Sequence, residues 1–206
     1  MGSYLNYLCD SYICSDIRNF SFSQKETKRS EHKCYCIDNG LMLMYAFRTA
    51  PLMTLEMHAA VVSRDVPRFQ SSKSSNGSNG YLFLGHSGTG KSTHARQWLA
   101  AFEVAWLLND DNPILRVMDN GEVRVYGSPW SGKTPCYKNE SYPIAGLCRL
   151  EQAPYNKIHR LPTILAIGAI LPSCPPVFAH DVTLQDMICD TVGRLLRTTR
   201  TYRLEC

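Results

Sequence analysis

The sequence predicts an α/β fold in which a mixed β-sheet is flanked by helices, and three stretches carry this prediction. The first is a glycine-rich loop between an apolar run and an amphipathic segment, within residues 81–102. The second is a pair of alternating segments around Asn120-Gly121, a strong short-range signal for an antiparallel hairpin. The third is an amphipathic helix expected from Val182 to Arg197, with Asp181 as its cap. Strands that alternate with helices favour a layered α/β domain.

The glycine-rich loop fits the pattern of a phosphate-binding loop. Gly85-x-x-x-x-Gly90-Lys91-Ser92 matches G-x-x-x-x-G-K-[ST]. In such a loop, successive backbone N–H groups surround nucleotide phosphates and the next helix presents its positive end. Lys91 is expected to reach the β- and γ-phosphates, and Ser92 to bind Mg²⁺. We therefore predict that the loop binds ATP, with these residues: Gly85, His86, Ser87, Gly88, Thr89, Gly90, Lys91, Ser92 and Thr93.

The surroundings of the loop support this interpretation over a chance glycine-rich turn. Tyr81–Gly85 is a short apolar run of the kind found in buried strands. Beyond the loop, one helical face carries Ala95, Trp98, Leu99 and Phe102 at positions i, i+3, i+4 and i+7. Strand, loop and helix thus follow in the order that phosphate binding requires. The sequence leaves open whether ATP, GTP or pyrophosphate is the donor.

Size and composition narrow the class of protein. With 206 residues, 44% of them hydrophobic, the chain can bury the core of a single soluble domain. A net charge of +4 is too small to indicate a nucleic-acid partner. The nine cysteines include Cys34-x-Cys36 but no second pair that would complete a zinc site, so we expect free thiols. No signal peptide is recognisable, and the apolar run Leu161–Leu171 is too short to span a membrane, so a cytoplasmic protein is expected.

The residues before the loop divide into a poorly defined segment and the start of the nucleotide-binding domain. Residues 1–40 are expected to pack on that domain, which we place at residues 41–206. A helix is expected over Leu41–Ala50, stopped by Pro51, and a strand over Leu55–Val62. Residues 63–80 are rich in Ser, Asn and Gly, which predicts a mobile loop between two strands.

An acidic pair follows the next strand. Val104–Leu108 is apolar and leads into Asp110-Asp111. One carboxylate of such a pair can hold Mg²⁺ and the other can accept a proton from a nucleophile; the alternative is a simple turn. Only 18 positions separate Ser92 from Asp110 (110 − 92), so the two strands are expected to be neighbours that end at the same edge of the sheet.

The remaining elements follow from local patterns. Ile114–Met118 and Glu122–Tyr126 form the predicted hairpin, which leads into a loop with Lys133. Lys133 either stabilises charge on a transferred phosphate or is a solvated surface lysine, and the sequence favours neither. A strand over Ile144–Leu150, a helix over Pro162–Leu171 and a last strand over Thr201–Cys206 complete the prediction.

Several of these motifs together resemble the HPr serine kinases and the phosphoenolpyruvate carboxykinases, which share a P-loop nucleotide-binding fold. The resemblance covers about residues 41–206, and it rests on His58, the loop Gly85–Thr93, Asn109-Asp-Asp-Asn-Pro113, Gly127–Lys133 and Gly146–Pro154. It implies a carboxykinase-like P-loop domain. It also leaves room for a homo-oligomer, since HPr kinases are assemblies, and for a further C-terminal helix beyond Cys206.

The resemblance assigns roles to individual residues. It implies that Asp110 accepts a proton, that Asp111 supports the metal beside Ser92, and that His58 lies near the phosphates. Arg149 would stabilise charge in the transition state. The HPr kinases have a glutamate in the strand that feeds their substrate loop, where this chain has Arg124, so HPr itself is not the expected acceptor.

The sequence therefore predicts a Mg²⁺- and ATP-dependent kinase that transfers a phosphoryl group to a hydroxyl of a small molecule or a protein. Lys91 and Lys133 would stabilise the transferred charge in that reaction. Neither a nucleic acid nor a membrane is expected as a partner. Two alternatives stay open at this point: an ATP-binding regulatory or maturation module without transfer activity, and, less favoured, carboxykinase-like chemistry.

Overall fold

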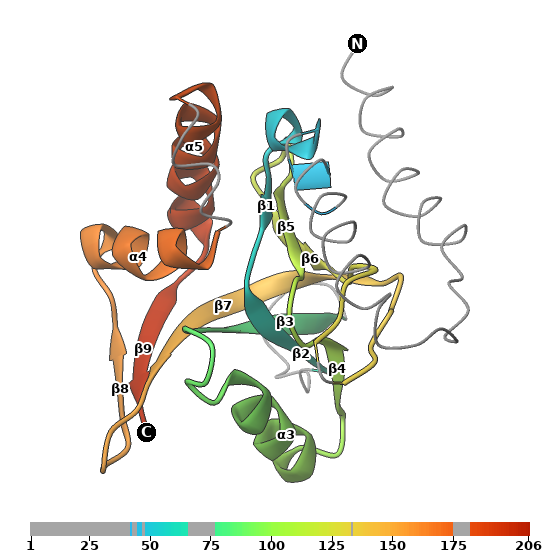
Figure 1. The fold of residues 1–206 in the computed structure, drawn as a ribbon, viewed down its shortest axis with the longest axis vertical. Helices are drawn as coiled ribbons and strands as arrows, with labels where there is room; N and C mark the ends of the chain where they lie inside the picture. Colours follow the sequence, from blue (N-terminus) through green and yellow to red (C-terminus); the bar gives the residue numbers. More distant parts are fainter. Residues whose placement is uncertain (1–41, 43–44, 47, 66–76, 133, 175–181) are drawn as a thin grey trace, which may run out of the picture.

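A computed structural model of the chain describes residues 42, 45–46, 48–65, 77–132, 134–174 and 182–206. Predictions for the N-terminal segment 1–40, for Lys133 and for the Asp181 cap lie outside the described residues. Within the described part, nine strands form one mixed sheet with helices packed against it (Figure 1). This confirms the predicted α/β class with a mixed sheet flanked by helices.

The sheet begins with β1 and has the order β1-β5-β6-β7-β3-β2-β4, with β9 beside β7 and β8 beside β9. The strands are β1 (Thr54–Glu56), β2 (Ala59–Asp65), β3 (Ser78–Leu84), β4 (Ala105–Asn109), β5 (Ile114–Val117), β6 (Val123–Tyr126), β7 (Ser141–Glu151), β8 (Lys157–Arg160) and β9 (Thr201–Glu205). The helices whose bounds lie within the described residues are η1 (Ala50–Leu52), α3 (Lys91–Ala101), α4 (Thr163–Ile170), η2 (Leu171–Ser173) and α5 (Val182–Thr198).

The long strand β7 joins two parts of the sheet. Its first residues, Ser141–Pro143, pair antiparallel with β6, whereas its middle residues pair parallel with β3. Its last residues, Leu147–Glu151, pair parallel with β9. Figure 1 shows β7 running across the molecule from the β5–β6 hairpin to β8 and β9. The end of β7 therefore lies directly beside the end of β3, where the glycine-rich loop begins.

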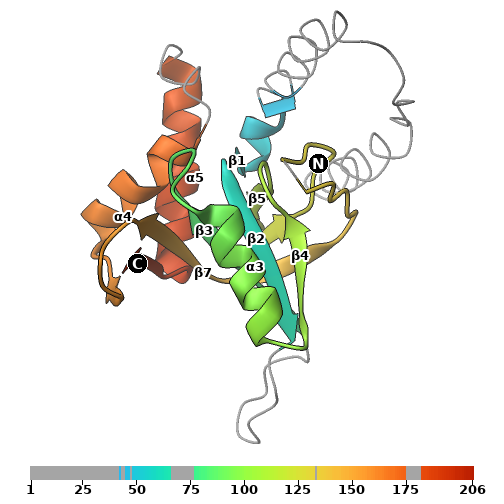
Figure 2. The ribbon, with the colours of Figure 1, turned by 60° about the horizontal axis from the view of Figure 1, so that its bottom comes forward.

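The strands at the centre of the sheet are apolar on both faces, because helices cover both. In β2 and β3, Val61 and Leu82 pack into the larger core, to which α5 contributes Ile188 and Leu195. The alternate residues, including Phe83, face the other way and meet Ala95 of α3. Figure 2 shows α3 lying along this second face, mainly over β2. Alternation with a period of two explains why neighbouring residues enter different cores.

Two predicted boundaries before the loop were wrong. The single strand expected over Leu55–Val62 is two strands, because the backbone leaves the sheet ladder at Met57 and His58. The Met57 N–H donates to the carbonyl of Pro113 (3.1 Å), and the His58 N–H donates to that of Ser173 (2.7 Å). The loop expected over residues 63–80 is shorter at both ends, since β2 extends to Asp65 and β3 starts at Ser78.

The prediction that the loop strand and the acidic strand are neighbours was also wrong. Strand β2 lies between β3 and β4 and pairs antiparallel with both. Because two antiparallel steps restore the direction, β3 and β4 run parallel, and their carboxyl ends reach the same edge of the sheet, as predicted. The short strand β8 was not predicted. Within the described residues, no helix is both long and apolar enough to cross a membrane.

Candidate functional site

The glycine-rich loop connects the end of β3 to the start of α3. Gly88 and Gly90 have φ of 83° and 104°, a region that residues with a side chain rarely adopt. No atom would crowd a Cβ at either position, so these glycines are required by backbone conformation and not by lack of space. Left-handed residues in a turn are typical of anion-binding nests, so the backbone of this loop has a conformation suited to an anion.

The start of α3 adds further donors to the loop. Helix α3 begins at Lys91 with Gly90 as its N-cap, and no side chain of the described residues caps it. Its first N–H groups are therefore available to an anion, and the helix dipole favours one there. Along the loop, Gly85 is buried, Thr89, Gly90 and Ser92 are half-buried, and His86, Ser87, Gly88 and Thr93 are exposed.

Lys91 lies beneath the loop and holds its shape. Its side chain is buried, and its ammonium group donates to the carbonyls of Gly85 (2.9 Å) and His86 (3.2 Å). Burial lowers the pKa of Lys91, Arg149 lowers it further, and Asp111 opposes this by raising it. A phosphate bound in the loop would be a negatively charged partner for this buried ammonium group and would stabilise its charged form.

Asp110 is buried, and the loop that follows Trp130 uses both of its carboxylate oxygens. One oxygen accepts hydrogen bonds from the Ser131 hydroxyl (2.9 Å) and the Gly132 N–H (2.7 Å), and the other accepts one from the Thr134 N–H (2.9 Å). A Cβ at Gly132 would come within 3.2 Å of the same carboxylate, which explains the glycine. Asp110 therefore anchors Ser131, Gly132 and Thr134 to the end of β4.

Asn109 is a site residue to which the sequence analysis assigned no role. Its side chain is fully buried, and its Oδ1 accepts from the N–H groups of both Asp111 and Asn112 (2.9 Å each). Its Nδ2 donates to the Ser128 hydroxyl and to the Trp130 carbonyl. Asn109 thereby fixes the turn that carries Asp111. An Asx turn was the available sequence signal, because Asn in such a turn bonds backbone two residues later.

Asp111 and His58 form a partly exposed pair at the same edge. The Nε2 of His58 lies 3.4 Å from Oδ1 of Asp111, and the side chains are 41% and 35% exposed. The other oxygen of Asp111 accepts from Asn112 (3.0 Å). His58 reaches this place because β2 runs antiparallel to β3 and β4, so that its first residues lie where they end. Unlike Asp110, this pair is accessible to a ligand.

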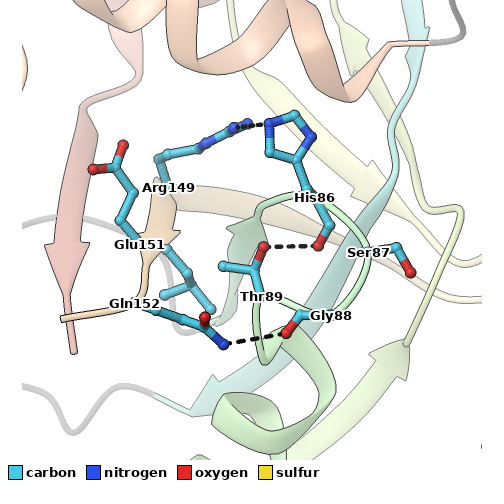
Figure 3. Close-up of a pocket in the computed structure, with 8 residues that line it drawn as sticks. His86, Ser87, Gly88, Thr89, Arg149, Glu151 and Gln152 are labelled. Carbon is cyan, nitrogen blue, oxygen red and sulfur yellow. Dashed lines mark hydrogen bonds between the residues drawn. The ribbon is translucent and has the colours of Figure 1, made fainter.

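Arg149, near the end of β7, faces the loop from the other side. Its guanidinium meets the His86 ring (3.0 Å) and donates to the carbonyl of Ala169 in α4 (3.4 Å). An arginine can only donate, so Nε2 of His86 accepts in this contact. Figure 3 shows the two side chains meeting end to end above the loop. Below them, the Gln152 amide donates to the Gly88 carbonyl (3.4 Å).

An open pocket of about 440 Å³ lies between these two contacts. Half of its lining comes from the glycine-rich loop and half from the end of β7: His86, Ser87, Gly88 and Thr89, and Arg149, Leu150, Glu151 and Gln152. Its volume falls within the range of about 300–1,000 Å³ that is typical of small-molecule and cofactor sites. The pocket thus adjoins the predicted phosphate site directly.

The residues expected to hold Mg²⁺ are of the right chemical kind. Ser92 supplies a hydroxyl and Asp111 a carboxylate, and hard oxygen donors are what Mg²⁺ prefers. Among the described residues, no cluster of three or more His, Cys, Asp or Glu side chains could hold a metal by itself. A magnesium ion that takes most of its ligands from phosphates and water needs only one or two such protein groups. Ser92 and Asp111 therefore fit a Mg²⁺–nucleotide complex better than a free ion.

The structure thus brings most of the predicted site residues to one edge of the sheet. His58, Asp111, Lys91 and Arg149 all lie around the glycine-rich loop, whereas Asp110 is buried beneath the neighbouring loop. A scan against protein-family models finds no match for the chain, and a search of curated proteins finds no significant match.

Proposed function

We propose that the protein transfers the γ-phosphoryl group of ATP to a hydroxyl group of a small molecule or a protein, with Mg²⁺ as the metal. One observation carries the proposal: a buried lysine donates to two carbonyls of a glycine-rich loop at the edge of the sheet where the accessible His58–Asp111 pair also lies. Phosphoryl transfer depends on positioning and on charge stabilisation rather than on covalent chemistry by the protein, and this arrangement supplies both.

In the proposed reaction, the loop and Lys91 hold the β- and γ-phosphates. Ser92 and Asp111 would hold Mg²⁺, which would supply positive charge against the phosphate oxygens. The acceptor hydroxyl loses its proton to His58, and its oxygen forms a bond to the γ-phosphorus. The bond between that phosphorus and its bridging oxygen breaks, and ADP leaves with the electron pair. Asp111 orients His58 and stabilises the positive charge that the ring gains.

The choice of His58 as proton acceptor differs from the sequence prediction, which gave this role to Asp110. Both oxygens of Asp110 already accept hydrogen bonds from the 131–134 segment, and its side chain is only 4% exposed. His58 is 41% exposed and contacts Asp111. A base must come within hydrogen-bond reach of the proton it takes, which favours the accessible histidine.

The proposal is tested with γ-labelled ATP, Mg²⁺ and size-fractionated extract of the host as the source of acceptor. The unchanged protein should transfer label to a protein or a small metabolite. His58→Gln and Asp111→Asn should each slow transfer by about 10²–10⁴-fold, the usual contribution of general base catalysis. His58→Gln should bind Mg²⁺–ATP as tightly as the unchanged protein, which calorimetry would show, whereas Asp111→Asn should bind it more weakly because it lacks a carboxylate that would hold the metal.

Other results would change the assignment. If His58→Gln transfers label normally while a folded Asp110→Asn does not, Asp110 is the proton acceptor. If the unchanged protein binds ATP, responds equally to ATP and a non-hydrolysable analogue, and transfers no label, the kinase proposal fails and a regulatory ATP-binding module replaces it.

A further inference from the structure

Strand β8 forms an edge of the sheet. It pairs antiparallel with β9, and no other described strand pairs with it. Figure 1 shows β8 at one side of the molecule, with β9 on its inner side. An edge strand presents backbone N–H and C=O groups that can pair with another chain. Which groups of β8 face outward depends on how the strand is turned relative to β9.

One hydrogen bond determines this orientation. The Leu161 N–H, directly after β8, donates to the carbonyl of Thr201 (2.9 Å). Along an antiparallel pair, residues that exchange hydrogen bonds with the partner strand alternate with residues whose N–H and C=O groups point away from it. His159, two positions before Leu161, therefore bonds to β9. The backbone groups of Ile158 and Arg160 face outward.

An apolar row of side chains crosses β7, β9 and β8 and ends at this edge. Leu150 lies opposite Leu204, which in turn lies opposite Ile158. Leu150 is buried, Leu204 is half-buried, and Ile158 is 62% exposed. Leu204 packs against the core to which α3 contributes, so the row lies on the α3 face of the sheet. An apolar residue of an added strand, opposite Ile158, would extend the row and bury the isoleucine.

The charges of β8 indicate the charge of a strand that fits. Lys157 and Arg160 are exposed and form no ion pair with a described residue, whereas Glu151 and Glu205 are already paired with neighbouring basic side chains. Opposite charges directly across two strands stabilise the pair, and like charges destabilise it. The edge therefore favours an acidic segment. A second copy of β8 would bring the same two cations to it.

We propose that the outer edge of β8 binds an extended acidic segment of a partner protein as an added strand. In the antiparallel arrangement, which is the more stable per residue, the segment has an acid opposite Arg160, an apolar residue two positions later opposite Ile158, and a second acid next to it opposite Lys157. Main-chain hydrogen bonds give affinity and alternate side chains give specificity in such strand addition. Strands β9 and β7 separate β8 from β3, so this surface is distinct from the phosphate site.

The test titrates ¹⁵N-labelled protein with a synthetic peptide and follows the backbone amides by NMR. The probe is acetyl-Thr-Glu-Thr-Val-Glu-Thr-amide, which carries the expected pattern, and its control has Lys in place of both Glu residues. The acidic peptide should shift the amide signals of Ile158 and Arg160 most, because these N–H groups face outward. The basic peptide should bind at least about 10-fold more weakly, a difference of about 1.4 kcal/mol.

Two variants separate backbone pairing from charge. Ile158→Pro removes an outward N–H and no bond to β9, and proline is tolerated at such edge positions. It should weaken binding of the acidic peptide by about 5- to 10-fold, whereas the control Ile158→Val should bind normally. Arg160→Glu should weaken binding by about 3- to 10-fold, and a peptide with Lys in place of the first Glu alone should restore it.

Several outcomes would overturn the proposal. These are the absence of binding at millimolar peptide, equal binding of the acidic and basic peptides, and a folded Ile158→Pro variant that binds as tightly as Ile158→Val. Shifts of the Ile158 and Arg160 amides with protein concentration alone would show that a second copy of the chain occupies this edge instead. Circular dichroism would verify the fold of each variant.

Discussion

Asp110 and Asp111 are neighbours in the chain but have opposite environments. Three donors of the 131–134 segment surround the Asp110 carboxylate, which is buried, while Asp111 points to a half-exposed histidine. Successive side chains after a strand diverge, so two adjacent acids rarely share one environment. In this site, one acid has a structural role and the other is available for ligand chemistry.

The structural role of Asp110 leads to a stability prediction. In Asp110→Asn, an amide N–H₂ replaces one of the accepting oxygens and faces the N–H donor of Gly132 or Thr134, so that the new amide group is buried without a partner. We expect the free energy of unfolding to fall by about 1–3 kcal/mol, the usual consequence of an unsatisfied buried group. Urea denaturation followed by circular dichroism measures it.

The matched control is Asp186→Asn on the exposed surface of α5, which should leave the unfolding free energy within about 0.5 kcal/mol. An Asp110→Asn variant as stable as this control would show that the loop does not depend on the carboxylate.

The described cysteines should differ in reactivity according to burial. Burial raises the pKa of Cys148 to about 12 and also raises that of Cys136. Only the thiolate is nucleophilic, so both thiols stay protonated and unreactive at about pH 8. Cys189 and Cys206 are exposed. Alkylation with iodoacetamide, followed by site-resolved mass spectrometry, should therefore label Cys189 and Cys206 long before Cys136 and Cys148. Rapid labelling of Cys148 in the folded protein would contradict the raised pKa of its thiol.

At the scale of elements, α5 and the glycine-rich loop use glycine for different reasons. Gly193 lies in the interior of α5, where an added Cβ would meet no other atom within 4 Å, whereas Gly88 has a positive φ. Glycine in a helix interior is less favourable than alanine by about 0.5–1 kcal/mol. Gly193→Ala should therefore raise the free energy of unfolding by about that amount, as measured by urea denaturation.

Gly88→Ala serves as the counterpart, because alanine is strained at a φ of 83°. It should lower the unfolding free energy and weaken nucleotide binding. If both substitutions changed stability in the same direction, the backbone conformation assigned to one of these elements would be wrong.

Elements with a strong local signal could be predicted from the sequence. The loop with its strand and helix, the hairpin around Asn120-Gly121 and α5 all lie close to their expected bounds. The interruption between β1 and β2 could not be predicted, because it depends on acceptors at Pro113 and Ser173, far along the chain. Strand β8 has only four residues and little apolar content, so no period identifies it.

The sequence identified which residues belong to the candidate site, but not how these residues are arranged around one another. The loop pattern identified Lys91 and Ser92, and the acids were found from their place after an apolar strand. The difference between Asp110 and Asp111 depends on hydrogen bonds from residues more than 20 positions later, which no local pattern reveals. The position of β2 between β3 and β4 was also missed, because the pairing of strands that are distant in the chain leaves no local pattern in the sequence.

At the scale of the whole molecule, the topology of the sheet assembles the site. Three strands, β7, β3 and β4, run parallel and end at one edge, and β2 begins there because it runs antiparallel. The glycine-rich loop, Asp110-Asp111, His58 and Arg149 therefore all lie at this edge of the sheet. Ligands in open α/β sheets bind outside the carboxyl ends of parallel strands, which is where these groups meet.

The most direct test of this account measures Mg²⁺–ATP binding by calorimetry in the unchanged protein and in Lys91→Ala. The account predicts one ATP per chain and a loss of affinity of about 10- to 100-fold in the variant, since hydrogen bonds to a charged group contribute about 1.5–3 kcal/mol. Circular dichroism would verify that the variant is folded. No binding by the unchanged protein, or equal binding by a folded Lys91→Ala, would contradict the assignment of the glycine-rich loop as a phosphate site.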